Sequence, residues 1–103
     1  MSVSDDDIAH VYEVFEGLEG VTHRKMMGGA SFYCDGQIFA IISASGQIYL
    51  KAKGDFAAAL ADEGASKFSM EDGRTMGYWT LPDAAVDDPE IATDWARRAL
   101  AAL

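Results

Sequence analysis

Apolar residues recur at helical spacing near both ends of the chain and alternate with polar residues in its middle. Ser4 and Asp7 have the spacing of a capping box, and apolar positions then repeat on one helical face. These apolar positions are Ile8, Val11, Tyr12, Phe15 and Leu18. We therefore expect an amphipathic helix that ends at the glycines of residues 17–20.

The middle of the chain has the pattern of strands joined by tight turns. Apolar and β-branched residues predict strands over 25–34, 37–43 and 47–52, separated by Asp35-Gly36 and Ser45-Gly46. Asp-Gly between two such runs is a strong signal for a two-residue hairpin turn. Two further strands, over 66–71 and 74–81, flank Asp72-Gly73.

Two more helices complete the expected order. Gly54-Asp55 opens an alanine-rich segment with Phe56 and Leu60, and Gly64 is placed to end it. Asp88 followed by Pro89 predicts the start of a terminal helix. Its expected buried stripe is Ile91, Trp95, Ala99 and Leu103. The order α-β-β-β-α-β-β-α predicts an α+β fold, a two-layer sandwich with a mainly antiparallel five-stranded sheet and helices on one face.

Two-residue turns would fix which side chains share a face of this sheet. They would pair Phe32 with Phe39 and Ile41 with Leu50. The predicted core face carries Ala30, Phe32, Phe39, Ile41, Ile48 and Leu50, joined by Phe68, Met70 and Trp79 of the last hairpin. The opposite face carries Ser31, Tyr33, Ile38, Ile42, Tyr49 and Lys51, joined by Lys67, Met76 and Tyr78.

Tyrosine, methionine and lysine on one sheet face are typical of interaction surfaces. The candidate surface comprises Tyr33, Tyr49, Lys51, Lys67, Met76 and Tyr78. A helix or loop of the same chain could cover it, its tyrosines could simply be half-exposed strand formers, or a second copy or another protein could bind there. A net charge of −9 makes direct binding of nucleic acid the least favoured use.

Composition limits the class of protein. A chain of 103 residues, half of them hydrophobic, has room for one compact domain, residues 1–103. It has no apolar run long enough for a bilayer and begins with an acidic segment, so we expect a soluble, cytoplasmic protein without a membrane partner. The single cysteine, Cys34, is expected to be a structural thiol.

Conventional catalytic patterns are absent from the sequence. His10 and His23 form no ligand pair, and no nucleophile elbow, phosphate loop or dinucleotide fingerprint occurs. We predict no enzyme activity, no cofactor and no metal site. One alternative stays open, a ligand-binding or catalytic site for an anionic small molecule, built from Arg24, Lys25, Gly28, Gly29 and Lys51. Because the glycine pair leads into a strand and not into a helix, a bulge or a close backbone approach is favoured.

Three stretches, RKMMGGASFYCDGQIFAII, GQIYLKA and MGYWTLPDAAVDDPEIATDWARRAL, resemble the N-terminal domain of the TfoX/Sxy family of bacterial competence regulators. The motif falls on Arg24, Lys25, Met26, Gly28, Gly29, Tyr49, Leu50, Lys51, Met76, Gly77, Tyr78, Trp79, Leu81 and Pro82. Met27 stands where phenylalanine is common. The resemblance implies a secretion-chaperone-like α/β fold and a regulatory role in DNA transformation through a protein partner, such as a transcription regulator, or a homodimer. Well-known members carry a second, helical C-terminal domain. The sequence of 103 residues does not include one, so we expect this chain to be a stand-alone N-terminal domain.

Overall fold

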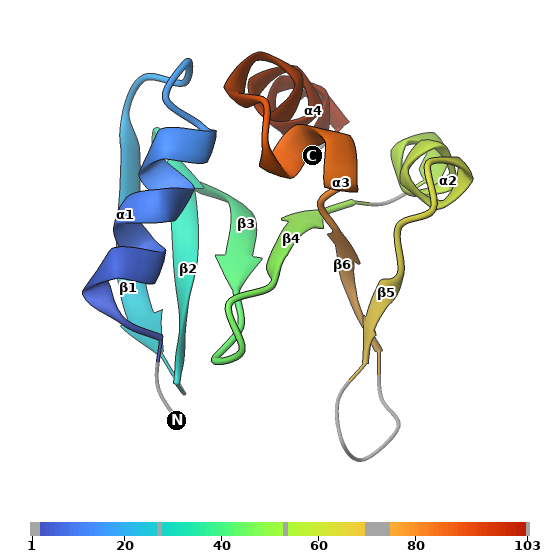
Figure 1. Ribbon diagram of the computed structural model, residues 1–103. Coiled ribbons are helices and arrows are strands. Elements are labelled where there is room, and N and C mark those ends of the chain that lie inside the picture. The colour runs from blue at the N-terminus through green and yellow to red at the C-terminus, as the bar shows by residue number, and fades with distance from the viewer. Residues whose placement is uncertain (1–2, 27, 53, 70–74, 103) are drawn as a thin grey trace.

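The computed structural model describes residues 3–26, 28–52, 54–69 and 75–102 (Figure 1). Its helices are α1 (Asp5–Val14), α2 (Gly54–Asp62), α3 (Asp83–Val86) and α4 (Pro89–Ala102). Its strands are β1 (Val21–Met26), β2 (Gly29–Cys34), β3 (Gln37–Ile42), β4 (Ile48–Lys51), β5 (Lys67–Ser69) and β6 (Thr75–Thr80). No described helix is long and apolar enough to cross a membrane.

The strands form one sheet in the order β1-β2-β3-β4-β6-β5, and every described pair is antiparallel. The α+β class and the main element order are therefore confirmed. The segment predicted as one strand over 25–34 is instead a hairpin, in which Met26 pairs with Gly29. Gly28 makes this reversal possible, because its φ of 86° is a conformation that residues with a Cβ rarely adopt. The described sheet thus has six strands.

The β2–β3 hairpin contains a bulge that the sequence did not reveal. Tyr33 pairs with Ile38, as predicted, but Phe32 pairs with Ala40 and not with Phe39. Phe39 is the extra residue, and it is fully buried. Beyond such a bulge the alternation of side chains along β3 shifts by one residue.

The β3–β4 connection is also longer than the predicted two-residue turn. The Ser43 N–H donates to the Gln47 carbonyl at 2.9 Å, and Ile42 pairs with Ile48. Ile42 is therefore a core residue, with 2% of its surface exposed, whereas Ile41 lies on the opposite face. This is the reverse of the predicted assignment of these two residues.

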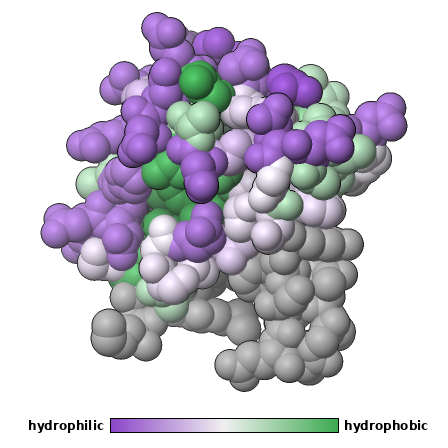
Figure 2. All heavy atoms as spheres, turned by 45° about the vertical axis from the view of Figure 1, so that its right-hand side comes forward, coloured by the Kyte–Doolittle hydropathy of each residue, from purple (hydrophilic) through white to green (hydrophobic). Residues whose placement is uncertain are grey.

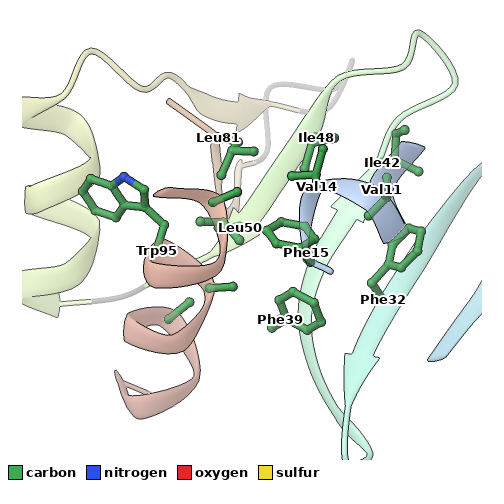
Figure 3. Close-up of a cluster of buried hydrophobic side chains, with 14 of the residues drawn as sticks. Val11, Val14, Phe15, Phe32, Phe39, Ile42, Ile48, Leu50, Leu81 and Trp95 are labelled. Carbon is green, nitrogen blue, oxygen red and sulfur yellow. The ribbon is translucent and has the colours of Figure 1, made fainter. Parts of the chain in front are cut away.

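One hydrophobic core joins all four helices to a single face of the sheet (Figure 3). The rings of Phe15, just after α1, and Phe39 meet edge to face with centroids 5.3 Å apart. The largest fully buried apolar side chains are Val11, Phe15, Phe32, Phe39, Leu50, Leu60 and Leu81. In Figure 1, α1 lies over β1 and β2 while α3 and α4 lie together beside the middle of the sheet.

The helix ends follow their sequence signals. The Asp7 N–H donates to Ser4 Oγ at 3.1 Å and the Ser4 N–H to Asp7 Oδ2 at 3.2 Å, which confirms the capping box. Asp88 Oδ1 accepts the Glu90 N–H at 3.0 Å at the start of α4.

The buried face of α4 matches the predicted stripe at Trp95 and Ala99 and differs from it at Ile91. Ile91 is 39% exposed, whereas Ala92, Ala96 and Ala99 are fully buried. A stripe centred on these alanines leaves Ile91 at its edge, and their small size lets α4 approach the sheet closely. Leu103 lies outside the described residues.

Candidate functional site

The sheet face opposite the helices carries tyrosine, basic and small polar side chains, and we call it the open face. One row of paired residues crosses five strands. It runs through Arg24, Ser31, Ile41, Tyr49 and Thr80, in this order. A second row pairs Lys51 with Tyr78. Because side chains alternate along a strand, the open face comprises Thr22, Arg24, Ser31, Tyr33, Ile38, Ile41, Tyr49, Lys51, Tyr78 and Thr80.

The tyrosines of the open face are buried to different extents, Tyr33 and Tyr49 in part and Tyr78 almost completely. Tyr78 is only 6% exposed, yet it does not belong to the buried cluster under the helices. Burial, followed by the neighbouring Tyr33, raises the pKa of the Tyr78 phenol. Strands β2 and β6, which carry Tyr33 and Tyr78, are separated by β3 and β4, about 14 Å in a flat sheet. The open face therefore presents partly buried aromatic side chains.

The open face has a different charge from the rest of the molecule. No described strand contains an aspartate or a glutamate, so the described carboxylates all lie on helices and connecting segments. Arg24 is exposed and Lys51 is half-buried, and neither has an ion pair in the described part of the chain. Figure 2 shows the molecule from one side, where hydrophilic side chains from the helices and connecting segments predominate around a smaller hydrophobic area. A molecule of net charge −9 thus has one sheet face on which the described charged residues are cations.

Strand β1 separates residues that the sequence places side by side. Lys25 points to the helix side and forms an ion pair with Asp5 at 2.8 Å, which lowers the pKa of the Asp5 carboxyl. His23 lies on that side too, and its Nδ1 is hydrogen-bonded to Tyr12 Oη at 2.6 Å. The sequence had offered no partner for His23. Of the basic residues on β1, Arg24 alone faces the open side.

The glycine pair of the family motif has a structural explanation. Gly28 forms the β1–β2 reversal, and its carbonyl accepts the Val3 N–H at 2.6 Å. A Cβ on Gly29 would lie 2.3 Å from the Ile42 carbonyl oxygen, so β2 and β3 need glycine at this position. This is the close backbone approach that the sequence favoured. Of the residues suggested for an anion site, the structure brings only Arg24 and Lys51 to one face.

The remaining predicted positions have varied surroundings. The Gly77 carbonyl accepts the Ala52 N–H at 2.8 Å, and Trp79 packs half-buried against the core. Cys34 Sγ donates to the Glu19 carbonyl at 3.3 Å, and burial raises the pKa of its thiol. The side chains of Met26, Lys67, Phe68 and Met76, like residues Met27, Met70 and Asp72-Gly73, lie outside what the structure describes.

Sequence reasoning missed one hollow on the helix side. It lies between the end of α1 and the first turns of α4, has a volume of about 420 Å³, and is lined by Glu16, Gly17, Pro89, Glu90, Thr93, Asp94 and Arg97. Arg97 donates to the Gly17 carbonyl at 3.1 Å there. Thr93 Oγ1 is buried against Gly17 without a hydrogen-bond partner in the described structure. Among the described residues, no group of three His, Cys, Asp or Glu side chains could hold a metal ion.

These features define a small α+β domain with one sheet face under helices and one cationic, tyrosine-bearing face without a described helix on it. The family model described as the TfoX N-terminal domain matches residues 13–103, and the chain belongs to this family. The matched region includes all fourteen motif positions named above, from Arg24 to Pro82. No curated protein matches the chain.

Proposed function

We propose that this protein is a non-enzymatic, cytoplasmic regulatory domain that acts through protein contacts made by the open face, as part of a process related to bacterial competence for DNA transformation. Membership of the TfoX N-terminal domain family supports the regulatory setting. The observation that carries the proposal is the open face, where Tyr33, Tyr49 and Tyr78 share one side of the sheet opposite all four helices.

Partly buried tyrosines are suited to binding a protein. A tyrosine offers a large contact area with few rotatable bonds, and an aromatic side chain that is already packed has little conformational entropy left to lose. Tyr33 and Tyr49 are half-buried, so each still exposes part of its surface for contact. Binding would therefore cost less ordering free energy here than at flexible charged side chains on the helices.

The second function considered from the sequence, a site for an anionic small molecule, draws less support. Its basic residues divide between the two sides of β1, since Lys25 is in the ion pair with Asp5 and only Arg24 joins Lys51. Gly28 and Gly29 have backbone roles in the hairpin and in strand approach. Arg24 and Lys51 are therefore assigned to the interaction surface.

Site-specific photo-crosslinking in the producing cell tests the proposal. The photoreactive amino acid p-benzoylphenylalanine replaces Tyr33 on the open face in one strain and Ile91, an exposed residue of α4, in a control strain. We expect a discrete crosslinked protein from position 33 that is absent from position 91 and is weakened by Tyr49→Ala. A product of twice the chain's mass would identify a second copy as the partner. Equal products from both positions, or products from position 91 alone, would contradict the proposal.

A further inference from the structure

We propose that the partner segment that occupies the open face is acidic, with Asp or Glu side chains on either side of apolar anchors. This inference rests on the proposed function and adds the chemistry of the partner. It comes from the juxtaposition of two cations, Arg24 and Lys51, with the apolar and aromatic residues Ile41 and Tyr49 between them on a face whose strands contain no carboxylate.

The placement of the cations sets the pattern that a partner must match. Arg24 begins the row that continues through Ser31 and Ile41 to Tyr49, and Lys51 lies two residues farther along β4. The two cations are therefore separated by three strand spacings and by two residues along the strand, about 16 Å in a flat sheet. About five residues of extended chain cover this distance. A segment with carboxylates near its ends and apolar side chains between them would match both charges and contact Ile41.

The two cations of the open face also differ from other basic residues of the molecule in their surroundings. Lys25 is neutralised locally by Asp5, and the Arg98 guanidinium stacks 4.3 Å from the centroid of the Trp95 ring. Arg24 and Lys51 have no such described partner. A carboxylate from a partner would give each of them a charge-assisted hydrogen bond, which is roughly twice as strong as a neutral one. The open face would therefore bind acidic segments in preference to basic ones. The carboxylates on the helix side of the molecule would instead attract basic segments.

An acidic protein segment fits the open face better than single-stranded nucleic acid. Proteins that bind nucleic acid neutralise a phosphate on each nucleotide contacted and stack bases on exposed rings. The described open face offers two cations, and Tyr78 is too deeply buried to stack on a base. The net charge of −9 would repel a polyanion of that charge density.

Selection from a display library of random twelve-residue peptides tests the inference with the intact protein as bait. The variants are Arg24→Glu, Lys51→Gln and Tyr49→Ala, and the matched control is Lys25→Glu. Lys25→Glu changes the net charge as much as Arg24→Glu does and lies on the neighbouring residue of the same strand, but on the helix side. Each variant is checked for native folding by its thermal transition before use.

We expect peptides enriched in Asp and Glu relative to the starting library, with affinity that falls by about fivefold or more in Arg24→Glu and less than about twofold in Lys25→Glu. Lys51→Gln should also weaken them. Selected peptides that depend on Tyr49 but carry no acidic excess would overturn this inference and leave the proposed function standing. Peptides that ignore Tyr49→Ala would contradict both. Tighter binding of oligothymidylate than of the selected peptides would overturn the choice of a protein segment.

Discussion

Gly29→Ala is the substitution whose effect follows most directly from the structure. The new Cβ would lie 2.3 Å from the Ile42 carbonyl oxygen, where ordinary contacts begin at 3.4 Å. Because the atom it meets belongs to the backbone of β3, no side chain can rotate away, and β2 and β3 must separate by about 1 Å. The hairpin that carries Ser31 and Tyr33 would be distorted.

The size of the effect can be worked out from packing. Overpacking costs about 1–3 kcal/mol, and replacing glycine by alanine in a strand without a clash would return about 0.5–1 kcal/mol. We expect a net loss of about 2 kcal/mol, because a backbone obstacle places the packing cost at the upper end. For a domain of this size, that corresponds to a fall of about 8–16 °C in Tm.

Gly77→Ala provides a matched control. Gly77 is also a strand glycine facing a carbonyl oxygen, but there the Cβ would lie 3.4 Å from the Ala52 oxygen. Its free energy of unfolding should change by less than about 0.5 kcal/mol or rise slightly. Urea titration followed by tryptophan fluorescence measures both variants. Equal stability of the two variants would refute the reasoning. If Gly29→Ala is fully stable but loses binding of an anionic small molecule that the wild type binds, the result would favour the anion site considered from the sequence.

Three further expectations concern single side chains. Asp88→Ala removes the cap that accepts the Glu90 N–H and should cost about 1 kcal/mol in urea titration, while the exposed neighbour variant Asp87→Ala should cost much less. Thr93 is 4% exposed, and its buried hydroxyl has no described hydrogen-bond partner. Thr93→Val should therefore leave stability unchanged or raise it by up to about 1 kcal/mol, and a clear loss would show that the hydroxyl is hydrogen-bonded. Burial and Tyr33 raise the pKa of Tyr78 above its ordinary 10.0, so the folded chain keeps this proton to higher pH than the unfolded chain. The resulting stability is present below pH 10.0 and is lost as the pH rises further. Between about pH 9 and pH 11 the wild type should therefore lose more stability than Tyr78→Phe. Equal losses in the two proteins would contradict the raised pKa of Tyr78.

Local signals in the sequence predicted local structure well. The Ser4–Asp7 capping box and the Asp88 cap were found because each depends on residues within one helical turn. The core positions Ile48 and Leu50 were also found, because β4 is short and alternates regularly.

The features that the sequence did not reveal depend on strand pairing. The bulge beside Phe32 and the loop closed by Ser43 and Gln47 reassigned Ile41 and Ile42, because a one-residue shift exchanges the two faces. Nothing within β3 itself signals that shift.

The candidate surface was predicted in part. Tyr33, Tyr49, Lys51 and Tyr78 do lie on one face, as the alternation of the strands indicated. Arg24 was missed as a member because β1 was not recognised as a separate strand. Once β1 is known, Arg24 and Lys25 must point to opposite sides, since adjacent residues of a strand alternate. The hydrogen bond between Tyr12 and His23 joins residues from two elements and had no sequence signal.

The proposed function requires that the open face is the surface through which this domain binds its protein partner. The most direct measurement is a map of backbone amide chemical shifts, recorded on labelled protein with and without the partner recovered by crosslinking. We expect the largest changes at Arg24 of β1, at Tyr33 of β2 and at Tyr49 and Lys51 of β4. Changes concentrated in α1 and α4, with these open-face amides unmoved, would contradict the claim.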